Sequence, residues 1–285
     1  MRARPPLLPV ALLLAAMCSI QFGASLAKSL FPVLGPAGAT AMRLVLATLI
    51  LLAIYRPWRG VSLQGSWRSL LIYGASLGFM NLAFYLALER VPMGIVVAIE
   101  FLGPLGVAIA ASRRVIDFAW VLLAVIGLAL LLPLTEHAKR LDPIGVLYAL
   151  LAGLGWALYI VFGTRAGSAH GSRSVAIGML VATAVVLPAG VVQAGSSLLT
   201  VSVLPIALAV AVFSSALPYT LEMYALTRIP TRTFGIFMSI EPALAALTGL
   251  AVLGELLTPL QWLAIGCVIL ASIGSAGTSA IRDSP

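Results

Sequence analysis

Three ionisable side chains lie inside stretches of the sequence that are otherwise apolar: Arg43, Glu100 and Glu241. A charge at the centre of a membrane helix costs about 2.5–3.5 kcal/mol on insertion scales. Such residues are therefore kept either as a structural ion pair or as part of a transport path. A guanidinium can bind an anion, and a carboxylate can bind a cation or a proton. Both roles are compatible with the sequence.

Prolines accompany these charges along the chain. Pro104 comes four residues after Glu100, and Pro242 directly follows Glu241. Pro218 marks a further break in another apolar stretch. Proline leaves a helix carbonyl without its usual donor, and in a membrane that carbonyl needs a partner from the protein or from cavity water. A proline alone can simply kink a helix for packing, whereas a proline beside a charge favours a cavity.

Neutral polar and aromatic side chains add to the candidate site. Trp156 and Tyr159 are predicted to lie deep in a span, which suits a cavity wall better than the aromatic belt at the membrane surface. Lys28 and Glu222 lie nearer to span ends, where a long side chain can also reach the interface. The remaining candidates are Gln21, Ser25, Asn81, Tyr85, Tyr219 and Tyr224.

The composition places these residues in a membrane protein. Hydrophobic residues make up 61% of the chain and charged residues 9%, against about 45–50% and about 25% in soluble domains. The net charge of +8 does not indicate nucleic-acid binding, because the basic residues fall between apolar spans. No nucleotide-binding loop or catalytic motif occurs, so we expect neither an enzyme nor a cofactor. The isolated Cys18 and Cys267 predict no metal site.

Charges and turn residues divide the chain into ten predicted spans. The longest uncharged stretch, Ser174 to Leu221, has 48 residues and would extend about 72 Å as one helix, more than twice the bilayer core. We therefore predict a turn at Gly195-Ser196-Ser197. The first span is expected to be retained rather than cleaved as a signal peptide. The spans are 8–27, 37–55, 70–88, 93–111, 116–134, 143–162, 174–194, 203–225, 233–253 and 259–280.

The distribution of Lys and Arg predicts that both termini are cytoplasmic. Four basic residues fall in the odd-numbered loops: Lys28, Arg90, Lys139 and Arg140. Twelve fall at the termini or in the even-numbered loops: Arg2, Arg4, Arg56, Arg59, Arg68, Arg113, Arg114, Arg165, Arg173, Arg228, Arg232 and Arg282. Cytoplasmic loops carry the excess of basic residues.

A weak internal repeat predicts two halves of opposite orientation. The segment 87–92 (ALERVP) resembles 225–230 (ALTRIP), and each precedes a span with one buried glutamate. Each half holds five spans, an odd number, so the second half must enter the membrane from the opposite side. This inverted repeat is common in secondary transporters. The halves are predicted to cover residues 8–136 and 143–281.

The helical rise gives the depth of the three charges. Arg43 and Glu100 are expected about 9 and 10 Å below the outer surface, so they share a level and could pair. Glu241 is expected about 12 Å from the cytoplasmic surface. It has no cation at its level in the sequence, which makes it the first choice for a proton carrier.

Several stretches resemble the ten-span EamA branch of the drug/metabolite transporter superfamily, and within it the bacterial inner-membrane threonine/homoserine exporters. They are 19–32 (SIQFGASLAKSLFP), 40–50 (TAMRLVLATLI), 94–108 (GIVVAIEFLGPLGVA), 112–125 (SRRVIDFAWVLLAV) and 216–259 (ALPYTLEMYALTRIPTRTFGIFMSIEPALAALTGLAVLGELLTP). The resemblance implies a central cavity in an all-α protein of ten membrane helices, and amino-acid efflux across the inner membrane by proton exchange. Lipid, an amino-acid substrate and protons are the implied partners.

The implied substrate assigns roles to the candidates. A zwitterion needs both signs at its site, so Arg43 would face the carboxylate, and Glu100 or Glu241 the ammonium. Glu241 or Glu100 would carry the proton. The whole predicted substrate site is Gln21, Arg43, Asn81, Tyr85, Glu100, Trp156, Tyr159, Tyr219 and Glu222. A passive channel or facilitator for a polar solute is the alternative, and a membrane receptor is a third class.

Overall fold

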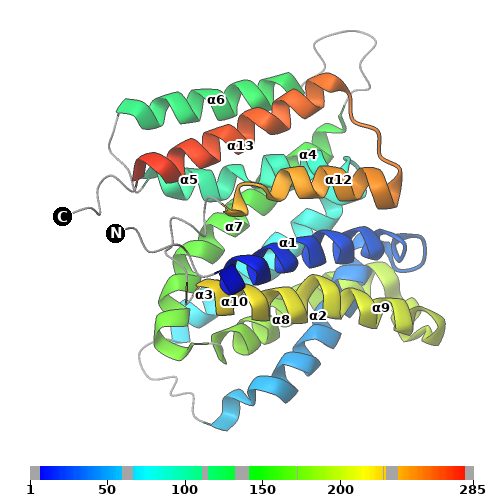
Figure 1. Ribbon diagram of the computed structural model, residues 1–285. Helices are drawn as coiled ribbons and strands as arrows, with labels where there is room; N and C mark the ends of the chain where they lie inside the picture. Colours follow the sequence, from blue (N-terminus) through cyan, green and yellow to red (C-terminus); the bar gives the residue numbers. More distant parts are fainter. Residues whose placement is uncertain are drawn as a thin grey trace.

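The computed structural model describes residues 7–59, 67–110, 115–131, 141–171, 173–226, 228 and 237–279. Over these ranges the chain is helical, without strands, and forms one bundle (Figure 1). Within the same ranges, six helical segments are long and apolar enough to cross a membrane, and four shorter apolar helices accompany them. The all-α membrane fold predicted from composition is confirmed.

Every predicted span contains a helix. The helices are α1 (Leu7–Lys28), α2 (Phe31–Tyr55), α3 (Trp67–Leu88), α4 (Met93–Glu100), α5 (Leu102–Ala110), α6 (Val115–Leu131), α7 (Pro143–His170), α8 (Arg173–Ala194), α9 (Leu204–Ala211), α10 (Leu217–Leu226), α12 (Glu241–Leu253) and α13 (Pro259–Ser279). Short 3₁₀ turns cover Pro57–Arg59, Gly195–Leu199 and Val201–Val203, and a π-helical turn, η4, covers Val212–Ala216. The fourth span is thus α4 and α5 together, and the eighth is α9, η4 and α10.

Local sequence explains where several helices begin and end. The long uncharged stretch turns at Gly195, as predicted, where φ is 51° and glycine avoids the clash of a side chain. Asp142 precedes α7 and its carboxylate accepts a hydrogen bond from the Ile144 amide at 2.9 Å, the usual role of an N-cap. After α12, Gly254 has φ 66° and ends the helix in the left-handed conformation that glycine favours.

The second span begins six residues earlier than predicted. Pro36 lies just before the predicted start of this span, and Gly35 leaves helical geometry with φ 65°. The helix nevertheless continues across this kink. Gln193 of α8 stabilises it, because its side-chain oxygen accepts hydrogen bonds from the amides of Ala37 at 2.7 Å and Gly38 at 3.3 Å.

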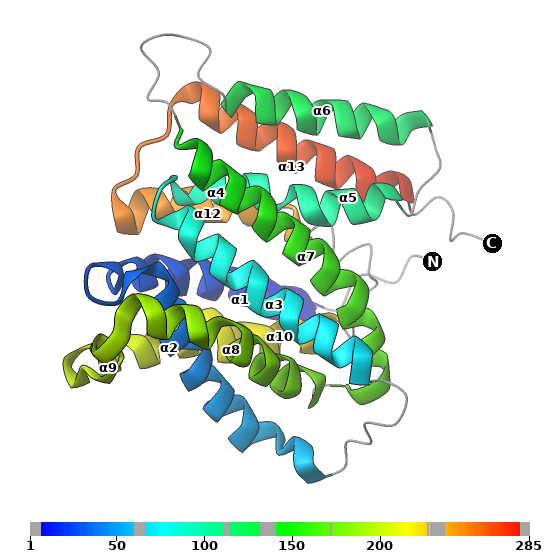
Figure 2. The same cartoon turned by 180° about the vertical axis from the view of Figure 1, so that it is seen from behind.

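The helix contacts occur in pairs that fit the predicted inverted repeat, while the bounds of its two halves stay a prediction. The first half comprises α1 to α6, and the second comprises α7 to α13. Suppose that α1 corresponds to α7, α3 to α9 and α10, and α4 and α5 to α12. Each of these contacts of α1 then has an equivalent contact of α7. The contact of α1 with α10 is equivalent to that of α7 with α3, and the contact of α1 with α12 is equivalent to that of α7 with α4 and α5. Three helices pack against their own counterparts: α2 on α8, α4 on α12 and α6 on α13. Figures 1 and 2 show α6 and α13 side by side at one edge of the bundle.

Glycines bring α3 very close to α7 and α8. A Cβ atom on Gly78 would lie 2.8 Å from the Ala182 carbonyl oxygen, and one on Gly155 would lie 3.0 Å from the Met80 Cα atom. Small residues allow such approach in membranes, where van der Waals packing rather than the hydrophobic effect holds helices together. We call this contact the glycine interface. Beside it, the hydroxyls of Thr48 in α2 and Thr183 in α8 are hydrogen-bonded at 2.8 Å.

Part of the orientation argument falls on residues outside the described ranges. These are Arg2, Arg4, Arg113, Arg114, Lys139, Arg140, Arg232 and Arg282. The side of the membrane on which each terminus lies therefore stays a prediction.

Candidate functional site

Arg43 is buried among neutral partners. Its side chain is 3% exposed. One terminal nitrogen, Nη1, donates to the Ser214 hydroxyl at 3.0 Å and to the Ser214 carbonyl at 3.3 Å, and Nη2 donates to the Asn81 side-chain oxygen. The guanidinium also lies 4.6 Å from the centre of the Tyr85 ring. Its Nε atom has no hydrogen-bond partner.

The predicted ion pair between Arg43 and Glu100 is not formed. Equal depth along two helices does not bring two side chains together, because each must also point toward the other. The acceptors of Arg43 come instead from α3 and η4. A buried cation that lacks an acidic partner is costly, so an anionic group of a bound substrate would stabilise this position.

A break in the eighth span supplies the carbonyl that Arg43 binds. Proline at position 218 has no amide hydrogen, so the Ser214 carbonyl four residues earlier lacks its usual donor. The π-helical turn η4 lies at this point, and such turns often occur at functional sites. The neighbouring Phe213 carbonyl also binds a side chain, accepting from the Ser19 hydroxyl of α1 at 2.6 Å. The proline break predicted here therefore serves polar contacts between helices.

Gln21 and Glu241 form a second buried contact. The Gln21 amide nitrogen donates to Glu241 Oε1 at 3.0 Å, and the two residues are 2% and 5% exposed. Among the residues that the structure describes, Gln21 Oε1 and Glu241 Oε2 have no hydrogen-bond partner. Glu241 is the first residue of α12. An unpartnered carboxylate oxygen at this depth is well suited to bind a proton or an ammonium group.

Glu100 lies where the fourth span is interrupted. It is the last residue of α4, it is buried, and Phe101 separates α4 from α5. Proline at position 104 cannot donate to the Glu100 carbonyl. The backbone of Gly153 in α7 lies against that carbonyl, so closely that a Cβ atom there would be 2.7 Å from its oxygen. Both buried glutamates therefore occur at helix interruptions, one in each half.

The remaining candidates connect these groups. Tyr219 of α10 lies within electrostatic reach of Arg43, Glu100 and Glu222. Glu241 lies within the same reach of Glu222 and Glu100. One guanidinium and three carboxyl groups therefore lie close enough in the bundle to act electrostatically on Tyr219 or on Glu241.

Two predicted aromatic residues line α7 beside this region. Tyr159 packs against Tyr73 of α3, with ring centres 5.1 Å apart. Trp156 packs edge-to-face on Phe101, next to Glu100, with ring centres 5.3 Å apart. Tyr73 was not among the candidates predicted from the sequence.

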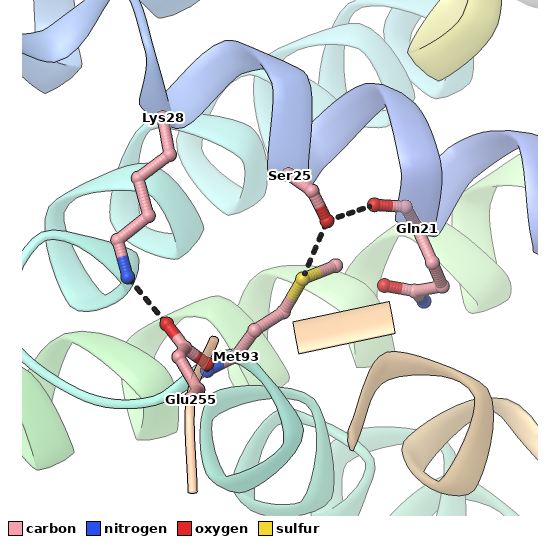
Figure 3. Close-up of polar contacts among 5 residues, drawn as sticks. All are labelled: Gln21, Ser25, Lys28, Met93 and Glu255. Atoms are coloured by element: carbon pink, nitrogen blue, oxygen red, sulfur yellow. Dashed lines mark hydrogen bonds and ion pairs between the residues drawn. The ribbon is translucent and has the colours of Figure 1, made fainter. Parts of the chain in front are cut away.

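Sequence reasoning did not select Glu255. Its Oε1 atom lies 2.5 Å from Lys28 Nζ, and its Oε2 atom accepts a hydrogen bond from the Met93 amide at 2.7 Å (Figure 3). Lys28 had been interpreted as either a site residue or a side chain reaching the interface. The signal that was available is the opposite charge of Lys28 and Glu255 in two loops predicted to lie on the same side of the membrane.

A second ion pair, between Arg90 and Asp142, lies outside the helices of the bundle core. Arg90 Nη1 is 2.8 Å from Asp142 Oδ2, and the two side chains are 38% and 32% exposed. The hydrogen bond from Arg90, followed by that from the Ile144 amide, lowers the pKa of Asp142 below its ordinary value. The same hydrogen bond raises the pKa of Arg90, which is protonated at any physiological pH in either case.

Comparisons with known proteins show what the chain resembles. The sequence model of the EamA-like transporter family matches residues 143–276. The threonine/homoserine exporter RhtA of Escherichia coli strain K12 is 56% identical over 278 residues, covering 98% of this chain and 94% of the exporter. RhtA of Salmonella typhimurium strain LT2 is 55% identical over 284 residues, covering 100% and 96%.

Two more distant proteins also resemble this chain, one in sequence and one in fold. The uncharacterized inner membrane transporter YedA of Escherichia coli strain K12 is 28% identical over 226 residues, covering 76% of this chain and 71% of YedA. A solved crystal structure superposes with a TM-score of 0.65 over 96% of this chain and 99% of that chain, at 17% identity. At this level of identity the superposition shows the fold alone.

Proposed function

This chain belongs to the EamA-like transporter family, and from that premise we propose that it exports small polar amino acids such as threonine and homoserine across the bacterial cytoplasmic membrane. The observation that carries the proposal is the 56% identity to a threonine/homoserine exporter over 98% of the chain. The buried polar region supports it, because it offers groups of both signs for a zwitterion.

In this proposal, Arg43 binds the substrate carboxylate. The described hydrogen-bond partners of Arg43 are neutral and its Nε atom has none among them, so a substrate carboxylate would be its first negatively charged hydrogen-bond partner. Charge-assisted hydrogen bonds to a guanidinium are roughly twice as strong as neutral ones. Asn81, Tyr85 and Tyr219 would hold the guanidinium and limit the room around the substrate.

The ammonium group and the proton share a carboxylate, which couples their movements. Glu241 is the preferred residue, because its Oε2 atom is buried without a partner. A carboxylate that holds a proton cannot form an ion pair with a substrate ammonium. Proton entry and substrate export would therefore alternate at one residue, which is the physical basis of exchange. Glu100, Glu222 and Gln21 complete the region around it.

The proposed arrangement in the membrane follows the basic residues and the repeat. Both termini face the cytoplasm, and residues 8–136 and 143–281 form the two halves. Reporter fusions after Ala138 and Ser197 should then read as external, and fusions after Arg59 and Gly171 as cytoplasmic. A reversed reading at any of the four positions would contradict this topology.

Export from cells tests the substrate. Cells that express the chain, when loaded with a panel of amino acids, should release threonine and homoserine faster than cells with an empty vector. Purified protein in proteoliposomes then tests the coupling. Accumulation of labelled threonine against its gradient, driven by a pH difference, is the expected result. Equilibration without accumulation would show a passive facilitator instead.

A further inference from the structure

Three polar side chains of α1 lie on one face of the helix and point toward the same neighbours. Gln21, Ser25 and Lys28 are spaced by four and three residues, which aligns them along the helix. Each contacts α4, α12 or the loop that follows α12. The contacts join Gln21 to Glu241 at 3.0 Å, Ser25 to Met93 at 3.4 Å and Lys28 to Glu255 at 2.5 Å. We call this contact the polar interface; Figure 3 shows the side chains of this interface except Glu241.

The partners of α1 across this interface are held together as one unit. A Cβ atom on Gly94 of α4 would lie 2.6 Å from the Ala246 Cβ atom of α12, so these two helices are in close contact. Glu255 strengthens the unit, because its carboxylate caps the first amide of α4, at Met93. Gly249 leaves the space that this carboxylate occupies, since a Cβ there would lie 2.8 Å from Glu255 Oε2.

The helix α1 belongs to a different unit. A Cβ atom on Gly23 would lie 2.6 Å from the Ser214 amide, and Ser19 donates to the Phe213 carbonyl. The rings of Phe22 and Phe213 also pack edge-to-face at 5.8 Å. Backbone contact therefore fixes α1 to η4, whereas side chains alone join it to Met93, Glu241 and Glu255.

Three layers follow one another along the polar interface. Gln21 and Glu241 form the buried polar layer. One helical turn away, Ala24, Val97 and Ala245 belong to an apolar cluster with Met93. The ion pair of Lys28 and Glu255 covers this cluster, with side chains 26% and 14% exposed. Gln21 and Lys28 are seven residues apart, about 10.5 Å along the helix.

We propose that the polar interface is the outer gate of the transport path, closed by the ion pair between Lys28 and Glu255, and that it opens when α1 separates from α4 and α12. The gate rests on the proposed function, since only a transporter needs to open there. The predicted topology places Lys28 and Glu255 at the external ends of their helices. A substrate that leaves the buried polar layer outward passes the apolar cluster and then this ion pair.

The ion pair of Arg90 and Asp142 provides a matched control on the same predicted side. It joins the end of α3 to the start of α7, and a Cβ atom on Gly145 would lie 2.8 Å from the Arg90 Cβ atom. These helices are also in close contact at Gly155. The pair therefore connects helices that stay together, and a cross-link between these two positions should leave transport unchanged.

A reductant-cleavable thiol cross-linker tests whether the ion pair must separate. The chain would carry Cys18→Ala and Cys267→Ala, with either Lys28→Cys and Glu255→Cys or Arg90→Cys and Asp142→Cys. Cross-linking the first pair should lower the export of labelled threonine at least about tenfold, the change that corresponds to about 1.4 kcal/mol, and the reductant should restore it. Cross-linking the second pair should have no effect. Full export by the first pair while cross-linked would overturn the proposal.

Thiol labelling tests the gate without any substrate. Ser25→Cys places a thiol beneath the ion pair in the same background, for reaction with a membrane-impermeant reagent applied from outside. Adding Lys28→Met should raise the labelling rate several-fold, whereas adding Arg90→Met should not. If cells do not produce folded Lys28→Met protein, Glu255→Gln removes the same ion pair and should have the same effect. Equal rates with and without the ion pair would overturn the gate. If removal of the ion pair speeds labelling but the protein exports no amino acid, the gate is supported and the proposed substrate is refuted.

Discussion

The glycine interface and the polar interface join helices by different means. At the glycine interface, α3 meets α7 and α8 through backbone atoms, as Gly78 and Gly155 show. At the polar interface, α1 meets α4 and α12 through three side-chain contacts. Close backbone contact leaves no room for water or a substrate between the helices, and it lets van der Waals packing hold them together in a membrane. Side-chain contacts can be replaced by water, a proton or a substrate, so the polar interface is the one that can open.

The largest expected effect comes from disturbing the glycine interface. Gly78→Val would place methyl groups against the Ala182 backbone, which cannot move without moving α8. Overpacking costs about 1–3 kcal/mol or more, so we expect little folded protein in the membrane, measured by size-exclusion chromatography in detergent. Gly167→Ala, where no atom lies within 4 Å of the added Cβ, is the control. Normal amounts of folded Gly78→Val protein would mean that this interface is less rigid than its contacts indicate.

Next in size is the loss of coupling at the polar interface. Glu241→Gln keeps a side chain of the same shape beside Gln21 but cannot exchange a proton. We expect no accumulation driven by a pH gradient, with folding intact. Exchange of labelled threonine in proteoliposomes should persist only with a raised KM, because the substrate ammonium loses its carboxylate partner. Glu89→Gln, at an exposed carboxylate, should leave both gradient-driven accumulation and exchange unchanged. Full gradient-driven transport by Glu241→Gln would refute its role, and the same loss in Glu100→Gln alone would transfer the role to Glu100.

A smaller effect is expected at Arg43, which binds but does not couple. Arg43→Gln removes the charge that faces the substrate carboxylate, and we expect the KM for threonine to rise about tenfold or more, since hydrogen bonds to charged groups contribute about 1.5–3 kcal/mol. Arg43→Lys keeps the charge but lacks the planar guanidinium, so its KM for threonine should lie between those of the unchanged protein and Arg43→Gln. An unchanged KM in Arg43→Gln would place the carboxylate elsewhere.

The smallest effect concerns Arg90 and Asp142, away from both interfaces. The pKa of Asp142 is lowered in the folded protein, so its contribution to stability is present above its unfolded pKa of about 3.9 and is lost as pH falls through the lower folded value. We expect a slight drop in Tm below about pH 4 that Asp142→Asn abolishes. Thermal unfolding in detergent measures it. An equal pH dependence in Asp142→Asn would assign the drop to other carboxyl groups.

The sequence predicted the helices and several of their ends, because the cost of exposing polar backbone to lipid leaves few alternatives. The turn at Gly195 and the proline break near Ser214 are examples. Two ends were wrong: α2 begins six residues before its predicted start, and α7 ends eight residues after its predicted end. The sequence predicted side-chain partners less well. Depth alone suggested Arg43 with Glu100, but direction around the helix axis decides the partner. Glu255 was missed because Lys28, its partner, is 227 residues away in the chain, and nothing local distinguishes it from an ordinary loop carboxylate.

The hydrogen bond between Thr48 and Thr183 has a consequence for how such a protein can arise. It joins α2 to α8, helices that correspond to each other in the two halves. A hydroxyl both donates and accepts, so it can face a copy of itself, whereas two like charges cannot. A half-length chain with small and hydroxyl residues along α2 would therefore be able to pair with an inverted copy of itself. Gene duplication and fusion would then free the charged positions, such as Arg43 and Glu241, to differ between the halves.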